Sequence, residues 1–103
     1  MDSILTDDLD NCYFCGKPAD DEHHLIFGNS GRGLAELDGI KVPICKACHT
    51  FSKIEDHIHE NPMAEKLSKM LGQAIWEKQR VSEGYSLEDA RDAFRKRYGK
   101  SYL

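Results

Sequence analysis

The sequence predicts a small α+β protein, in which a β-hairpin braced by two cysteine knuckles is followed by helices. Three observations support this class: a length of 103 residues, two Cys-x-x-Cys pairs and a helical repeat in the second half. The length fits one domain whose single core is thin, so a bound metal would add stability. We expect three parts: an acidic lead-in at 1–11, a knuckle-braced core at 12–62, and a helical extension of the same domain at 63–103.

The four cysteines form two identical pairs, which are Cys12-Tyr-Phe-Cys15 and Cys45-Lys-Ala-Cys48. Two separated Cys-x-x-Cys pairs are typical of a tetrahedral structural zinc site with four thiolate ligands. Gly16 follows the first pair and eases its turn. Disulfides would need an oxidising compartment, and a redox-active pair would be single and close to a βαβ pattern. Zinc is therefore the favoured interpretation, although zinc-braced folds serve many functions.

Between the knuckles, two short apolar segments predict the strands of the hairpin. His23–Phe27 is the first strand candidate and Ile40–Ile44 the second, where Pro43 suggests an edge strand or the end of the strand. The glycine-rich stretch 28–33 is expected to be a loop. It lacks the Lys-Ser/Thr ending of a nucleotide-binding P-loop, so we do not interpret it as one.

The second half of the chain predicts helices. The segment Thr50–Glu60 is a candidate helix start, and Asn61-Pro62 is typical of an N-cap followed by proline in the first turn. Apolar residues then recur at helical spacing, and we expect them to fill the core: Met63, Leu67, Met70, Leu71, Ala74 and Ile75. Gly84 ends this region, and Ser86 resembles the N-cap of a last helix that Gly99 stops.

The charge is unevenly distributed. The formal net charge is −4, and residues 1–22 hold seven acids and one lysine, whereas residues 91–103 hold five bases and one acid. Apolar content of 40% and charged content of 31% indicate a folded soluble protein. No apolar run approaches membrane-spanning length, and the first residues do not form a secretory signal. We expect a cytoplasmic protein with no membrane partner.

All five histidines lie between residues 23 and 59, at His23, His24, His49, His57 and His59. His49 directly follows the second cysteine pair, so its backbone is expected to be held by that knuckle. A hairpin would bring the strand with His23 and His24 beside the strand entering Cys45, so distant histidines could converge on a second metal ion. Neutral imidazole serves both as a metal ligand and as a base near neutral pH. The alternative is that His23 and His24 are hydrogen-bonded polar residues at a strand end.

Several motifs together resemble the HNH endonucleases, a branch of the ββα-metal (His-Me finger) nucleases. The core motifs are Cys12-x-x-Cys15, His23-His24-Leu25-Ile26 and Ile44-Cys45-x-x-Cys48-His49, within residues 12–62. They match the variant braced by a four-cysteine zinc. His59-Glu60-Asn61-Pro62 and the ending Tyr98–Leu103 are similar to small phage and prophage HNH proteins. A fainter similarity links the chain to RecA-dependent recombination-enhancing phage nucleases.

The resemblance implies a role for each matching residue. His24 would be the general base that activates water. His23 and His49 would hold the catalytic divalent ion, Mg²⁺, Mn²⁺ or Zn²⁺, together with His59 or, as an alternative, His57. The four cysteines, Cys12, Cys15, Cys45 and Cys48, would hold the structural Zn²⁺. In the family an asparagine usually precedes the second cysteine pair and positions the loop of the base. Ile40 stands there, so Asn29 or a backbone group would have to substitute, or catalysis would be lost.

The expected function is hydrolysis of DNA phosphodiester bonds, with 5′ phosphate and 3′ hydroxyl products implied by the resemblance. Arg32, Lys46, Lys53 and the basic stretch 95–100 are candidate phosphate contacts. No set of residues indicates base-specific recognition. One alternative is a non-catalytic zinc ribbon that binds DNA or a recombination or replication protein, docking through the helices from Met63 onward. A second is a phage inhibitor or adaptor whose acidic N-terminal segment mimics nucleic acid.

Overall fold

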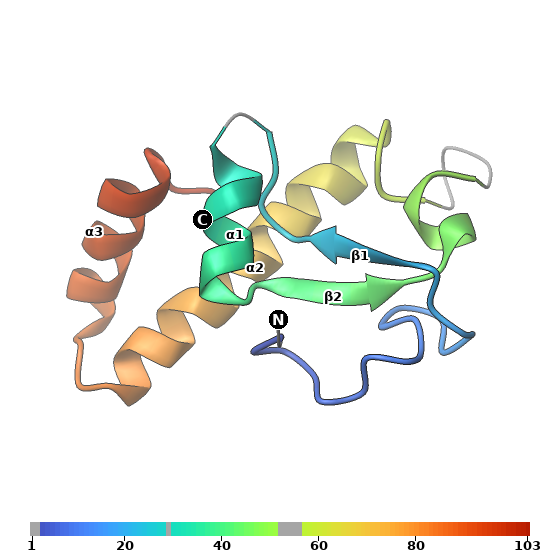
Figure 1. Cartoon of the computed structure of the whole chain (residues 1–103). Helices are drawn as coiled ribbons and strands as arrows, with labels where there is room; N and C mark the ends of the chain where they lie inside the picture. The colour runs from blue at the N-terminus through green and yellow to red at the C-terminus, as the bar shows by residue number, and fades with distance from the viewer. Residues whose placement is uncertain (1–2, 29, 52–56) are drawn as a thin grey trace.

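The computed structural model describes residues 3–28, 30–51 and 57–103. The elements follow in the order β1 (Asp21–His24), α1 (Gly31–Asp38), β2 (Lys41–Ile44), the short π-helical turn η1 (Ala47–Phe51), α2 (Pro62–Ser82) and α3 (Leu87–Tyr98). The predicted α+β class, a two-stranded antiparallel hairpin with helices, is confirmed. Figure 1 shows α2 passing behind α1 and the hairpin, with α3 at the opposite end of the molecule from η1.

The hairpin is shorter than the sequence predicts. β1 starts at Asp21, paired with Ile44, and ends at His24, paired with Lys41. The predicted extension of the first strand to Phe27 is wrong. Leu25 and Ile26 are both fully buried, but the ladder with β2 ends before them, at the His24–Lys41 pair. The chain leaves the strand after His24, so both side chains enter the core, while the Leu25 N–H still bonds the Ile40 carbonyl at 3.0 Å.

The glycine-rich stretch does not form the predicted simple loop, because its second half opens helix α1. Gly31 lies at the start of this helix, where an added Cβ would come within 3.2 Å of the Ile26 side chain, so glycine permits close packing there. Ala35 anchors the helix in the core. Gly39 ends it in the left-handed conformation that glycine favours, with its N–H bonded to helix carbonyls.

The predicted start of α2 is confirmed, since Asn61 caps the helix and its side-chain oxygen accepts from the Ala64 N–H at 3.3 Å. The predicted core face of α2 is wrong at its first turns: Met63 is 73% exposed and Leu67 56% exposed. The buried residues of α2 are instead Ser68, Gly72, Gln73, Trp76 and Glu77. The helix packs closely on Leu25 and Ile26: an added Cβ at Gly72 would lie 3.0 Å from side-chain atoms of both residues, and the Ser68 hydroxyl donates to the Leu25 carbonyl at 2.8 Å.

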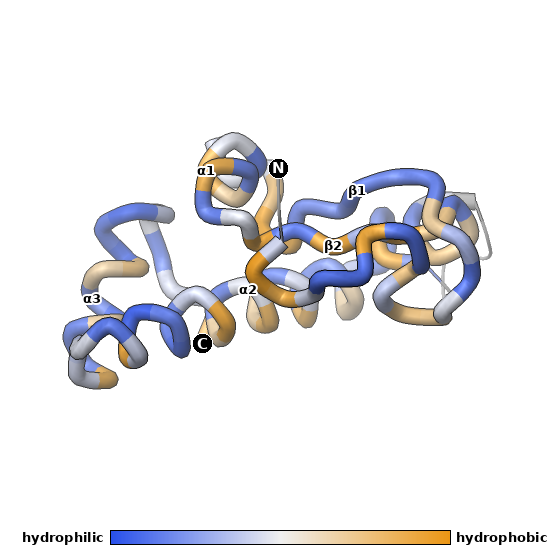
Figure 2. Tube along the Cα trace, turned by 60° about the horizontal axis from the view of Figure 1, so that its bottom comes forward, coloured by the Kyte–Doolittle hydropathy of each residue, from blue (hydrophilic) through white to orange (hydrophobic). Residues whose placement is uncertain are grey.

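Helix α3 has the predicted caps, with Ser86 accepting from the Asp89 N–H at 3.0 Å and Gly99 in the left-handed conformation. Its Phe94 belongs to the main core cluster, which consists of Ile26, Ala35, Ile40, Trp76 and Phe94. Figure 2 shows hydrophilic residues over β1 and most of α3, and hydrophobic residues in β2. The main core cluster thus brings residues of α1, α2 and α3 together with Ile26, which follows β1.

The acidic N-terminal lead-in contacts the rest of the fold. Figure 1 shows it running below β2. The Ile4 N–H bonds the Gly39 carbonyl at 2.9 Å, and Leu5 packs against the main core cluster. Among the helices of the described residues, none combines the length and the apolar character needed to cross a membrane.

Candidate metal centres

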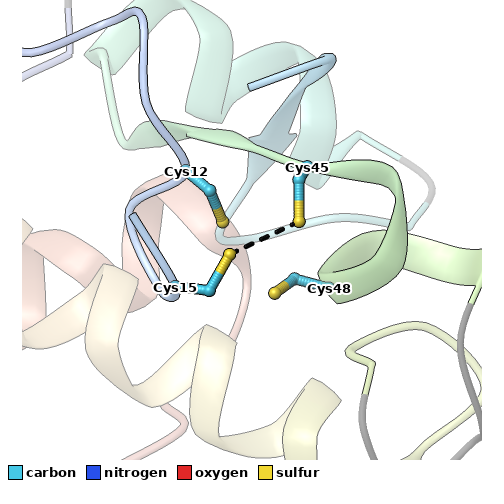
Figure 3. A group of neighbouring side chains, drawn as sticks. All are labelled: Cys12, Cys15, Cys45 and Cys48. Carbon is cyan, nitrogen blue, oxygen red and sulfur yellow. Dashed lines mark hydrogen bonds between the residues drawn. The ribbon is translucent and has the colours of Figure 1, made fainter. Parts of the chain in front are cut away.

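The four cysteine thiols converge at the end of the hairpin remote from α1. Figure 3 shows Cys12 and Cys15 from the N-terminal knuckle pointing toward Cys45 and Cys48. Cys45 precedes η1, and Cys48 lies near its start. Their sulfur atoms all lie within 4.8 Å of one another, and the Sγ atoms of Cys15 and Cys45 are 3.6 Å apart. We call this group the cysteine cluster. It can hold a metal ion, and four sulfurs from two knuckles are the donor set of a structural zinc site.

The local backbone builds each knuckle. Gly16 has a positive φ of 81° and its N–H bonds the Cys12 carbonyl at 2.9 Å, which closes the first turn. The Tyr13 N–H bonds the Pro43 carbonyl at 2.9 Å and so attaches this turn to β2. Burial favours the neutral thiol of Cys12, but backbone N–H groups of Cys45 and Cys15 outweigh it and lower the pKa of Cys12 to about 6. These donors favour a thiolate, the form that binds metal.

Three histidines form a second cluster. His23 from β1, His49 from η1 and His59 from the turn before α2 place their ligand nitrogens within 4.8 Å of one another. We call them the histidine cluster. The ring centroids of His23 lie 5.3 Å from His49 and 5.1 Å from His59, and those of His49 and His59 are 4.6 Å apart. His57 is buried but is not a member, so of the two alternatives the geometry groups His59 with the other ligands.

The ring of His23 has a defined hydrogen-bonding state. The Ser68 hydroxyl donates its one hydrogen to the Leu25 carbonyl at 2.8 Å. It must therefore accept from His23 Nε2, which lies 2.8 Å away and carries the ring hydrogen. Nδ1 then has the lone pair, and this atom is buried with no hydrogen-bond partner among the described residues. An unpaired buried nitrogen is costly unless it has a ligand, so this atom fits a metal bond.

A carboxylate lies close to the Nδ1 atom of each of the other two rings, His49 and His59. Asp21 Oδ2 lies 3.6 Å from His49 Nδ1, and Glu65 Oε2 lies 3.5 Å from His59 Nδ1. A carboxylate or hydroxyl behind the ring is the usual support of a metal-binding histidine, since it fixes the tautomer and raises ligand basicity. Burial, with the neighbouring His59 and His49, lowers the pKa of His23 to about 3. His23 is therefore neutral at physiological pH, as metal binding requires.

His24 faces a different partner. Its Nε2 lies 2.8 Å from Glu36 Oε1 on α1, and the same carboxylate accepts from Lys41 Nζ at 3.0 and 3.2 Å. The hydrogen bond from His24, followed by that from Lys41, lowers the pKa of Glu36 to about 2. The two adjacent histidines thus have separate surroundings at the end of β1, one within the histidine cluster and the other against α1.

The histidine cluster and His24 line the same small pocket, which has a volume of about 160 Å³. Its lining residues are Glu22, His23, His24, Phe27, Arg32, His49 and His59. Of the candidate phosphate contacts, Arg32 therefore lies at the site. Lys46 lies in the second knuckle, where its N–H bonds Asp20 at 3.0 Å, and Lys53 lies outside the described residues. In the basic stretch 95–100, Arg97 forms a two-contact ion pair with Asp38, at 2.7 Å each.

Sequence reasoning missed the supporting residues, which are Asp21, Glu36, Glu65 and Ser68. Glu65 and Ser68 lie one and two turns into α2, and Glu36 lies in α1, a helix that the sequence did not predict. The spacing of Asn61-Pro62 fixes the start of α2 and places residues 65 and 68 on nearby turns, which is the one signal that was available. No sequence signal joined Glu36 to His24.

The chain matches the family described as "Protein of unknown function (DUF968)" over residues 8–78. The matched segment contains both clusters together with Glu36 and Ser68. The comparisons with curated proteins and with solved structures gave no match.

Proposed function

This chain belongs to the family described as "Protein of unknown function (DUF968)", and we propose that it is a metal-dependent endonuclease of the HNH type that hydrolyses DNA phosphodiester bonds. One observation carries the proposal. The three-histidine cluster, in which His23 is buried and His49 and His59 are half-buried, and the carboxylate-bound imidazole of His24 line one pocket that Arg32 also lines. This combination offers a metal site, a base and a phosphate-binding cation within reach of a single phosphodiester.

The histidine cluster indicates which ion the site prefers. Three neutral imidazole nitrogens suit Zn²⁺ and other later transition ions, whereas Mg²⁺ and Mn²⁺ prefer oxygen ligands and water. A divalent ion held by His23, His49 and His59 would supply stabilisation of the negative charge that develops on the phosphate and the leaving oxygen. We therefore expect Zn²⁺ to support activity better than Mg²⁺.

His24 acts on the water. Its Nδ1 takes a proton from the water as the water oxygen forms a bond to phosphorus and the bond from phosphorus to the 3′ oxygen breaks. The 3′ oxygen leaves with a proton from solvent, which gives 5′ phosphate and 3′ hydroxyl ends. Arg32 binds a phosphate oxygen at the rim of the pocket, and contacts of this kind position DNA without reading its sequence.

The cysteine cluster supports the site structurally. Cys48 and His49 are adjacent in η1, and the His49 N–H bonds the Cys45 carbonyl at 3.1 Å. Zinc bound to the four cysteines would fix this turn and thereby hold His49 against His23. Zn²⁺ is therefore proposed as a structural ion, separate from the ion of the histidine cluster.

Nicking of supercoiled plasmid by zinc-loaded protein tests the proposal. The protein is first given one zinc for the cysteine cluster and then assayed with added Mn²⁺, Zn²⁺, Mg²⁺ or chelator. We expect His24→Ala to lose roughly 100- to 10,000-fold in rate, the usual contribution of a general base, while the metal content is unchanged. Folded protein that binds metal at both clusters but cleaves no DNA would reject the nuclease.

A matched pair of arginine variants tests the phosphate contact. Arg32→Gln removes the cation that lines the pocket, whereas Arg95→Gln removes an exposed cation on α3 that pairs with Asp92 at 3.0 Å. Arg95 belongs to the basic stretch 95–100, another candidate phosphate contact, but it does not line this pocket, so we expect the first variant alone to raise the DNA concentration needed for half-maximal rate. Equal effects of the two variants would mean that Arg32 contributes only general charge.

The second candidate is a non-catalytic binding module for DNA or for a recombination or replication protein. The exposed apolar side chains of Met63 and Leu67 on α2 favour it, because they give this helix an uncovered apolar surface. A binding module predicts that Met63→Glu with Leu67→Glu abolishes partner capture, and that His24→Ala leaves this capture intact.

A further inference from the structure

We propose that Glu36 is the positioning residue of His24, holding the imidazole ring so that Nδ1 carries the lone pair for the attacking water. This inference rests on the proposed endonuclease function and adds to it the group that orients the base. The sequence raised the question directly, because Ile40 stands where a positioning asparagine was expected. Helix α1, which the sequence did not predict, supplies the residue that occupies this role.

The geometry defines the tautomer. Glu36 Oε1 lies 2.8 Å from His24 Nε2, and an ionised carboxylate only accepts hydrogen bonds. The hydrogen of a neutral His24 therefore lies on Nε2, and Nδ1 has the lone pair. His24 is 8% exposed and lines the pocket, so the ring has little freedom to turn to another partner.

Glu36 is itself held in place. Lys41, which is 2% exposed, donates to both Glu36 oxygens and also pairs with Glu22 at 2.8 Å. Lys41 lies directly opposite His24 in the hairpin register, so the two donors reach the Glu36 carboxylate from neighbouring strands. The Ile40 N–H bonds the Ala35 carbonyl at 3.0 Å and ties the end of α1 to the start of β2.

The charge of this network suits a base. When Nδ1 takes the proton of the water, His24 becomes an imidazolium with hydrogens on both nitrogens. The Glu36 carboxylate stabilises that positive charge, and Lys41 keeps the carboxylate anionic, so the proton remains on the ring. Glu36 thus acts electrostatically and by orientation, and it does not touch the substrate.

Two other carboxylates provide matched comparisons. Glu65 lies 3.5 Å from the ring of His59, so it supports a metal ligand rather than the base. Glu22 shares Lys41 with Glu36 at 2.8 Å but is not bonded to His24. A change at Glu65 should therefore act on metal affinity. A change at Glu22, which lines the same pocket, removes one partner of Lys41 but leaves the bond between Glu36 and His24 in place.

The experiment compares Glu36→Gln and Glu36→Ala with Glu65→Gln and Glu22→Gln, all loaded with zinc at both clusters. The first measurement is the tautomer of His24, read from nitrogen–proton NMR correlations of the ring. The parent protein is expected to hold hydrogen on Nε2. Glu36→Ala is expected to populate both tautomers, whereas Glu22→Gln and Glu65→Gln keep the parental state.

The second measurement is plasmid nicking. Glu36→Ala should lower kcat by about ten- to a hundredfold, part of the contribution of a general base, with KM and the metal affinity of the histidine cluster unchanged. Glu36→Gln, which keeps an acceptor oxygen, should retain an intermediate kcat. Glu65→Gln should instead weaken metal binding and recover with excess metal.

The two readouts separate the two proposals. An unchanged His24 tautomer in Glu36→Ala, or a loss of metal affinity equal to that of Glu65→Gln, would overturn the positioning role. A tautomer that depends on Glu36, in a parent protein that binds metal at both clusters and cleaves no DNA, would support the positioning of the ring and reject the endonuclease.

Discussion

Replacing Ser68 with alanine tests the link between packing and the histidine cluster. Ser68 is buried, and its hydroxyl makes two hydrogen bonds of 2.8 Å, one from His23 Nε2 and one to the Leu25 carbonyl. Alanine removes only the oxygen, so the helix and its packing on residues 25–26 are kept. The change therefore isolates the hydroxyl as the support of the His23 ring.

The expected cost follows from the two groups left without a partner. Each buried polar group that loses its hydrogen bond costs about 1–3 kcal/mol, so for two such groups we expect Ser68→Ala to lower the free energy of unfolding by about 2–6 kcal/mol. His23 is also free to move its hydrogen to Nδ1, the atom needed for the metal. Loss of such a supporting contact weakens metal binding by about 10- to 100-fold.

The assay uses protein whose cysteine cluster already holds zinc. Urea unfolding gives the stability, and a titration with Co²⁺, followed by its absorption, gives the affinity of the histidine cluster. Ser82→Ala is the control, because Ser82 lies on the same helix and its hydroxyl donates to the Gln79 carbonyl at 2.6 Å in an exposed position. Unchanged Co²⁺ affinity in Ser68→Ala would refute the assignment of His23 Nδ1 as a ligand.

Three further predictions concern packing, pH and metal. In Gly72→Ala the new methyl group would lie 3.0 Å from both Leu25 Cβ and Ile26 Cγ1, so thermal unfolding should show a loss of about 1–3 kcal/mol from overpacking, larger than the gain of about 1 kcal/mol in helix propensity. Because burial and neighbouring imidazoles lower the pKa of His23 from 6.5 to about 3, the unfolded chain binds more protons below pH 6.5. Without metal at the histidine cluster, urea unfolding should therefore show that His23 contributes a fall in stability of up to about 1.4 kcal/mol per pH unit below that value, so His23→Asn should make the fall with pH less steep. Stripping metal from the cysteine cluster with a strong chelator should lower the circular dichroism signal and the unfolding midpoint, and zinc should restore both; a midpoint insensitive to the chelator would contradict the structural role.

Elements defined by local chemistry were predicted well. Asn61 with Pro62 fixed the start of α2, and Ser86 with Gly99 bounded α3, because caps act within one helical turn. The cysteine pairs could also be recognised, since each knuckle is a local turn, and the four thiols that they bring together are compatible with a structural zinc site. The sequence also allowed distant histidines to be expected close together, because pairing of the two strands beside the second knuckle is enough to bring His23 near His49 and His59.

Predictions failed where a distant segment decided the outcome. Leu25 and Ile26 leave the strand because α2 packs on them at Gly72, a contact between segments more than forty residues apart. The same contact buries Ser68, which bonds the Leu25 carbonyl, while Gln73 is buried against Ser101 and Tyr102. Met63 and Leu67 are left exposed, the reverse of what hydrophobic spacing predicts for these positions. Spacing reports the amphipathicity of a helix, but the partner surface decides which residues fit against it.

The adjacent histidines illustrate both sources of information. The sequence alone determined the donor chemistry: four cysteines in two knuckles, five histidines within one segment, and two of them side by side. Only the tertiary structure decided how the pair is divided. His23 faces His49 and His59 with Ser68 behind it, while His24 faces Glu36 on a helix the sequence did not predict. The type of a ligand atom is a property of its residue, whereas its tautomer and direction depend on hydrogen bonds from segments that only folding brings together.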